Sequence, residues 1–165
     1  MQVELQWLRK DYLPQFQSIY QHAFGTEFDP AEYLSTHNCF GRVAVGWTQN
    51  GDDIVLGVLL FSLAPQVVRV DAIAVHPGCL RQRVGTGILD RVKELAPKFQ
   101  RPQLNVTVPE SKLEVLQFFK ANGFVAIGSM PNDAIEMVYR LDAQDRRWIP
   151  KNRVSQYLER PGDGN

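Results

Sequence analysis

A loop with the composition of a phosphate-binding site lies near the middle of the chain, between an apolar strand pattern and a helical pattern. It carries Arg81 and Arg83 and leads into the run Gly85-Thr86-Gly87. Free backbone N–H groups at the start of a helix, backed by the helix dipole, bind anions such as pyrophosphate. Gly85 would let phosphates approach the main chain, which a Cβ would hinder, and the arginines would add charge-assisted contacts. An ordinary strand–loop–helix connection with solvated arginines explains a single Gly-x-Gly pair equally well.

Two carboxylates lie near this loop in the pattern of strands and could accept a proton. Asp71 interrupts the apolar strand that leads into the loop, where an acid is costly without a purpose or a partner. We expect it to be a general base, and pairing with Arg69 or with a donor of a neighbouring strand is the structural alternative. Glu110 follows the next strand, at the expected mouth of a cleft, and a solvated loop acid is its alternative. His76 could also transfer a proton, and we interpret it as a bystander.

The first half of the chain predicts four strands and two helices around one hairpin. Asn50-Gly51 stands between two strand patterns and is the strongest short signal for an antiparallel hairpin. Asp29 before Pro30 predicts the start of a short helix. The expected elements are a strand at 3–8, a helix from 13 to 23, a short helix at 30–36, strands at 42–48 and 54–61, and a nearly apolar strand at 67–75.

The second half alternates helices and strands. A helix starting near Thr86 carries an apolar stripe as far as Phe99. The run 111–114 has the pattern of a capping box that opens a second helix, and Gly123 closes that helix. Three strands complete the pattern, at 104–108, 124–127 and 134–141. This order predicts an α/β (α+β) layer structure with a mixed, mostly antiparallel central sheet of about seven strands flanked by helices.

Length and composition predict one globular domain at 1–141, followed by a polar C-terminal arm at 142–165 that docks on the body or on the second subunit of a homodimer. Lys and Arg together equal Asp and Glu, 18 against 18, so the basic excess typical of nucleic-acid binding is missing. We recognise neither a membrane span nor a signal peptide, and Cys39 and Cys79 lack metal-ligand spacing. We therefore expect a cytoplasmic protein without a metal, and without nucleic-acid or membrane partners.

Three motifs resemble those of one enzyme family. Val-His-Pro at 75–77 is followed by seven residues and Gly85, and an Ile-Leu helix pattern begins three residues later. This arrangement is similar to motif A of the GNAT acetyltransferases. The run 117–124, which ends in Gly-Phe, resembles the family's second helix. The run 133–141 resembles the closing strand of the branch that includes ribosomal-protein-alanine N-acetyltransferases.

The resemblance implies a GNAT fold whose sheet splays between 67–75 and 104–108 around an acyl-CoA cleft. Acetyl-CoA would be the co-substrate. Its acetyl group would pass by direct attack to a primary amine of a protein N-terminus, a lysine or a small molecule. The implied cofactor-binding residues are Ile73, Ala74, Val75, Arg81, Gln82, Arg83, Val84, Gly85 and Thr86, and the catalytic candidates are Asp71 and Glu110.

Several positions depart from the family pattern. Aligning Gly85 with the family's final loop glycine preserves the spacing, whereas the register 82–87 fits the glycines literally but needs a two-residue insertion. The tyrosine that protonates the leaving thiolate in many members would fall at Phe119. The glutamate base of the alanine-acetylating branch aligns with Thr107, and that branch's helix-start asparagine aligns with Lys112.

These departures keep a second function open: a non-catalytic module that binds or senses acyl-CoA. A nucleotide-binding α/β domain of another type is a third interpretation, and the antiparallel hairpin at Asn50-Gly51 disfavours it.

Overall fold

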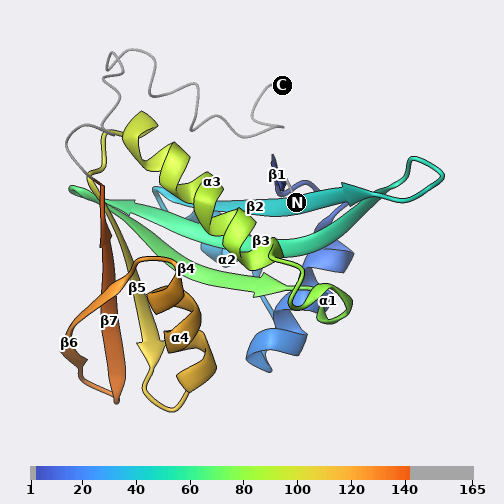
Figure 1. The fold of residues 1–165 in the computed structure, drawn as a ribbon. Helices are drawn as coiled ribbons and strands as arrows, with labels where there is room; N and C mark the ends of the chain where they lie inside the picture. The colour runs from blue at the N-terminus through green and yellow to red at the C-terminus, as the bar shows by residue number, and fades with distance from the viewer. Residues whose placement is uncertain (1–2, 142–165) are drawn as a thin grey trace.

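The computed structural model describes residues 3–141, and these form seven strands and four α-helices (Figure 1). The predicted polar arm at 142–165 lies outside the described residues. The elements in chain order are β1 (Glu4–Trp7), α1 (Leu13–Phe24), α2 (Pro30–Ser35), β2 (Cys39–Trp47), β3 (Asp53–Ala64), β4 (Val67–Val75), a 3-10 turn (Pro77–Cys79), α3 (Val84–Lys98), β5 (Gln103–Pro109), α4 (Leu113–Ala121), β6 (Val125–Met130) and β7 (Ala134–Arg140).

All seven strands belong to one sheet, in the order β1-β2-β3-β4-β5-β7-β6. Every neighbouring pair is antiparallel except β4 and β5, which run parallel. The hairpin predicted at Asn50-Gly51 joins β2 to β3, with Trp47 opposite Asp53. The prediction of a mixed, mostly antiparallel sheet is therefore confirmed.

Local sequence signals account for the ends of the first two helices. Asp29 caps α2, because its side chain accepts a 3.0 Å hydrogen bond from the Glu32 N–H. Pro30 occupies the first turn of that helix, where its missing N–H costs nothing. Gly25 ends α1 in the left-handed conformation, with φ of 71°.

Two helix starts and several strand ends differ from prediction: β2 begins at Cys39 rather than at residue 42, and β3 continues to Ala64 rather than ending at residue 61. Helix α3 begins at Val84 rather than near Thr86. The reason is that the Arg83 carbonyl accepts a 2.9 Å hydrogen bond from the Gly87 N–H, which forms the first helical turn. The capping box at 111–114 is wrong: the N-cap of α4 is Lys112, and no side chain caps this helix. The Lys112 N–H donates to Pro109 O at 2.9 Å, so a tight turn precedes the helix. Strand β6 continues beyond residue 127 to Met130.

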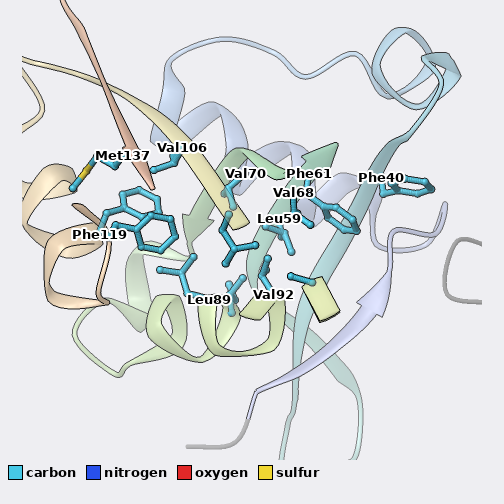
Figure 2. Packing of buried hydrophobic residues seen from close by; sticks show 14 of the residues in the cluster. Phe40, Leu59, Phe61, Val68, Val70, Leu89, Val92, Val106, Phe119 and Met137 are labelled. Carbon is cyan, nitrogen blue, oxygen red and sulfur yellow. The ribbon is translucent and has the colours of Figure 1, made fainter. Parts of the chain in front are cut away.

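The helices cover the two faces of the sheet in pairs. In Figure 1, α3 and α4 lie in front of the sheet and α1 and α2 lie behind it. Figure 2 shows Leu89 of α3 and Phe119 of α4 in the same buried cluster as Val70 of β4 and Val106 of β5. A second buried cluster joins α1 to the opposite face of β2, β3 and β4. The two layers hold the sheet rigidly at the strands that carry the site.

Residues 3–141 contain neither a candidate membrane span nor a candidate metal site. None of their helices has the length and apolar character needed to cross a membrane. No group of three or more His, Cys, Asp or Glu side chains in this part of the chain is arranged to hold a metal ion.

Candidate active site

A β-bulge at Asp71 divides the central strand into two functionally different halves. In the β3–β4 pairing, Phe61 lies opposite Val70 and Leu60 lies opposite Ala72, so Asp71 is the extra, unpaired residue. The side chains change face at this point: Val70 belongs to the core under α3, and Ala72 belongs to the core under α1. The bulge therefore turns the second half of β4 relative to the first half.

The sheet opens at the same point. Pairing between β4 and β5 extends from Val67 opposite Gln103 to Val70 opposite Val106 and goes no further. The arrows of the two strands diverge in Figure 1. Residues 71–75 therefore have an edge that no strand covers, as the predicted splay requires.

Backbone N–H groups face this open edge. The His76 N–H donates to Leu56 O of β3 at 2.8 Å. Because N–H groups of alternate residues point to the same side of a strand, those of Ala74 and Ala72 also face β3. The N–H groups of Ile73 and Val75 are therefore directed toward the gap between β4 and β5. Of the three residues predicted as backbone donors, the alternation favours Ile73 and Val75 over Ala74.

A cavity of about 590 Å³ begins at this edge and ends at the start of α3. Eight of the nine predicted cofactor-binding residues line it: Ile73, Ala74, Val75, Arg81, Arg83, Val84, Gly85 and Thr86. Gln82 does not; its side-chain amide lies 3.4 Å from Gly78 O and points back into the loop. Besides Cys79 and Leu80 of the loop, the prediction omitted three lining residues of α4, namely Glu114, Val115 and Phe118. They were missed because nothing in the local sequence shows that α4 packs beside α3.

The loop between β4 and α3 is held by its own hydrogen bonds. Nδ1 of His76 accepts the Gly78 N–H at 2.9 Å, which gives His76 a structural task in this turn. Arg81 and Arg83 both have left-handed backbone conformations, with φ of 62° and 63°. Both side chains are exposed and line the cavity. The loop thus presents two cations at the N-terminal end of α3, an arrangement suited to an anion.

Gly85 and Gly87 have different neighbours, and this distinguishes the two loop registers. A Cβ on Gly85 would meet the ring of Phe118 at 3.1 Å and Val75 at 3.5 Å, at the wall of the cavity. A Cβ on Gly87 would collide with Val3, on the buried side of α3. The structure therefore supports the register that places Gly85 at the final loop glycine, and it assigns Gly87 to packing.

A second cavity, of about 300 Å³, lies on the other side of the split between β4 and β5. Asp71, Thr107, Lys112 and Phe119 are among its lining residues. Ile73 and Val115 line both cavities. A molecule in the larger cavity and a molecule in the smaller one would therefore meet at Ile73, next to the backbone donors.

Asp71 accepts a hydrogen bond from a residue that the sequence did not single out. The hydroxyl of Tyr33 on α2 donates to Oδ2 of Asp71 at 2.6 Å. Burial and this hydrogen bond raise the pKa of Tyr33 far above its usual value, so the hydroxyl remains a donor. The donor lies on helix α2, so the partner of Asp71 is neither Arg69 nor a residue of a neighbouring strand, the two alternatives that were predicted. The carboxylate remains exposed and lines the smaller cavity.

Glu110 and Phe119, the other two positions weighed for catalysis, differ in their surroundings. Glu110 is exposed and lines neither of these cavities, and its backbone N–H donates to Asp133 O at 2.8 Å. Phe119 is 1% exposed and packs edge-on against Phe118 and Phe124, while it also borders the smaller cavity. Phe119 is therefore a core residue at the position where a hydroxyl was expected.

The assembled groups suit the transfer of an acyl group between two bound molecules. The larger cavity offers cations and a helix N-terminus to a phosphorylated ligand. The donors at Ile73 and Val75 face the junction, where they can stabilise negative charge on a carbonyl oxygen. Asp71 faces the smaller cavity, two residues along β4 from Ile73.

The chain matches one family model and shares its fold with solved structures. A sequence model described as the acetyltransferase (GNAT) family matches residues 5–124. No curated protein sequence matches the chain.

Solved structures of three acetyltransferases share the fold. The ribosomal-protein-S18-alanine N-acetyltransferase of Escherichia coli is 18% identical, with a TM-score of 0.67 over 91% of this chain and 97% of that chain. Naa50 of Arabidopsis thaliana, solved with the bisubstrate analogue CoA-Ac-MVNAL, is 16% identical, with a TM-score of 0.69 over 86% and 100%. An acetyltransferase of Bacillus subtilis, solved with CoA, is 18% identical, with a TM-score of 0.65 over 85% and 98%.

The family match covers most of the described chain, from β1 to the residue after the turn that closes α4. It includes the bulged strand, the phosphate loop and both helices that line the larger cavity. This chain therefore belongs to the acetyltransferase (GNAT) family.

Proposed function

We propose that this protein transfers the acetyl group of acetyl-CoA to a primary amine, and that both substrates are bound at the same time. Bound acetyl-CoA supplies an activated thioester that an amine attacks directly. Arg81, Arg83 and the first turn of α3 would hold its pyrophosphate. The N–H groups of Ile73 and Val75 would stabilise the charge that develops on the thioester oxygen.

The acceptor amine would occupy the smaller cavity. A primary amine is mostly protonated at pH 7, so a base must take its proton before attack. Asp71 faces that cavity, and we assign it this role; Glu110 remains the second candidate. Tyr33 would hold the Asp71 carboxylate in position and would not contact the amine. The nitrogen–carbon bond then forms as the carbon–sulfur bond breaks, and CoA leaves with the sulfur.

One observation carries this proposal: the two cavities share Ile73 and Val115 at the place where β5 leaves β4. A module that only bound acyl-CoA would need the larger cavity alone. The smaller cavity, with a carboxylate on its wall, adds room for a second substrate. Two further predictions rest on the sequence alone. They are that the protein is cytoplasmic and that it forms a homodimer through the polar arm.

Release of free thiol from acetyl-CoA, measured across a panel of amines and peptides, tests the proposal. We expect release above the rate of uncatalysed hydrolysis for at least one class of amine, with formation of the matching amide by mass spectrometry. Binding of acetyl-CoA without release for any member would instead support the sensing module, which the phenylalanine at position 119 favours.

A further inference from the structure

The smaller cavity carries opposite charges on its two walls. Asp71 comes from the bulge of β4, and Lys112 comes from the turn between β5 and α4. The two side chains form no ion pair within 4.0 Å in the part of the chain that the structure describes. Both charges are therefore available to a bound molecule, although Asp71 also accepts a hydrogen bond from Tyr33.

Within the described part of the chain, no carboxylate forms an ion pair with Lys112. No ion pair or side-chain hydrogen bond involves its ammonium among residues 3–141. Lys112 is exposed and lines the smaller cavity but not the larger one, so we place its charge beside the space assigned to the amine rather than to CoA. An anion bound in this space would find its counter-charge in Lys112.

The wall between the two charges is mostly apolar. Its lining residues include Phe24, Val70, Val106, Val108 and Phe119, with Thr107 as a neutral polar residue. Away from the two charges the lining is apolar, so a charged group of a ligand is best accommodated against the wall residue of opposite sign. An apolar body joining the two charged groups would fit this wall.

Resting on the proposed function, we infer that the acceptor is a small primary amine that also carries a carboxylate, with an apolar body between or beside the two groups. Its amine would lie at Asp71 and its carboxylate at Lys112. A simple alkylamine would leave Lys112 without a partner, and a diamine would place a second cation against it. A volume of about 300 Å³ is at the small end of ligand pockets, which favours a free amino acid over a folded protein surface.

Matched pairs of acceptors that differ only in the carboxylate test this inference. The pairs are phenylalanine with phenethylamine, leucine with isopentylamine, and aminohexanoate with hexylamine; cadaverine serves as the diamine. We expect kcat/KM to be about tenfold or more higher for the carboxylated member of at least one pair, because a charged hydrogen-bonded contact is worth that much. The inference would be overturned if every plain amine had a kcat/KM equal to or higher than that of its carboxylated partner.

Substitutions at Lys112 identify the group that reads the carboxylate. Lys112→Gln should lower kcat/KM for the preferred amino carboxylate about tenfold to a hundredfold and leave its plain amine within about twofold. Lys112→Glu should shift the preference toward cadaverine. Lys120→Gln is the matched control, because Lys120 is exposed on the same helix and lines neither cavity. An equal loss for both members of a pair would mean that Lys112 does not read the carboxylate.

A binding measurement separates this inference from the proposed function. Calorimetry on the CoA-loaded protein compares phenylalanine with phenethylamine without any turnover. Tighter binding of phenylalanine that Lys112→Gln abolishes supports the inference even if no amine is acetylated, and only the proposed function then fails. If the protein instead acetylates a peptide with blocked carboxylates in preference to every amino carboxylate, this result supports the proposed function and overturns the inference.

Discussion

The Tyr33 hydroxyl of α2 donates a 2.6 Å hydrogen bond to Oδ2 of Asp71, the residue that bulges out of β4. This contact joins a helix on one face of the sheet to the point where the sheet opens. It leaves the carboxylate on the wall of the acceptor cavity while fixing one of its oxygens. We propose that Asp71 accepts the proton of the amine and that Tyr33 positions its carboxylate.

Replacing Asp71 with Asn should slow acetyl transfer without loosening the cofactor. A general base contributes typically 10²–10⁴-fold, and we expect kcat/KM for the amine to fall by that order. Affinity for CoA should stay nearly constant, because Asp71 lies outside the larger cavity. The pH–rate profile and a CoA titration check both statements. Glu110→Gln is the comparison. If kcat/KM falls tenfold or more in that variant only, the roles of the two acids are reversed.

Gly85 and Gly87 should respond differently to an added side chain. Gly85→Val places a branched group at the cavity wall against Phe118, so it should abolish the thermal shift given by CoA. That shift corresponds to about 2.7 kcal/mol at a hundredfold excess of ligand over Kd. Gly87→Ala should instead lower the melting temperature of the unliganded protein, since its Cβ meets Val3. A normal CoA shift in a folded Gly85→Val protein would contradict the loop assignment.

Restoring a hydroxyl at position 119 should speed turnover. Phe119 is buried but borders the acceptor cavity, so Phe119→Tyr can present a proton donor there. We expect kcat to rise by roughly tenfold, below the 10²–10⁴-fold that a fully positioned acid or base typically contributes. Steady-state kinetics and denaturant unfolding are measured together on the same variant. Lower stability with no gain in rate would mean that this position serves the core alone.

The stability of the protein should fall in alkali, partly because of two tyrosines. Burial and the bond to Asp71 raise the pKa of Tyr33, and burial with a bond to Asp53 raises the pKa of Tyr12 to about 12. An unfolded tyrosine ionises near pH 10, so both groups stabilise the fold fully below about pH 10. For Tyr12 this contribution is lost as the pH rises from about 10 to 12.

Denaturant unfolding between pH 8 and pH 12 measures this loss. Tyr33→Phe and Tyr12→Phe should each show a smaller decline of the unfolding free energy with pH than the unmodified protein. Slopes identical to that of the unmodified protein would contradict the assigned environments.

Local sequence was sufficient to predict most of the elements and their order. Asn50-Gly51 predicts the β2–β3 hairpin, and in the turn Gly51 has the left-handed conformation that glycine tolerates, with φ of 83°. Asp29-Pro30 predicts the start of α2 through a side-chain cap. The run from Val75 to Gly85 predicts a loop that leads into a helix, and α3 begins there. These features depend on residues that are close together in the chain, so local backbone preferences determine them.

Only the tertiary structure determined which residues share the site. The bulge at Asp71 depends on the pairing of β3 with β4, and the alternation of apolar residues does not reveal it. Tyr33 reaches Asp71 from α2, 38 residues away in the chain, and Lys112 reaches the same cavity from the far wall. Glu110, close to the cleft in sequence, lines neither cavity because the chain turns away after β5. Side chains from distant segments meet only once the sheet has opened, so their contacts depend on packing rather than on spacing.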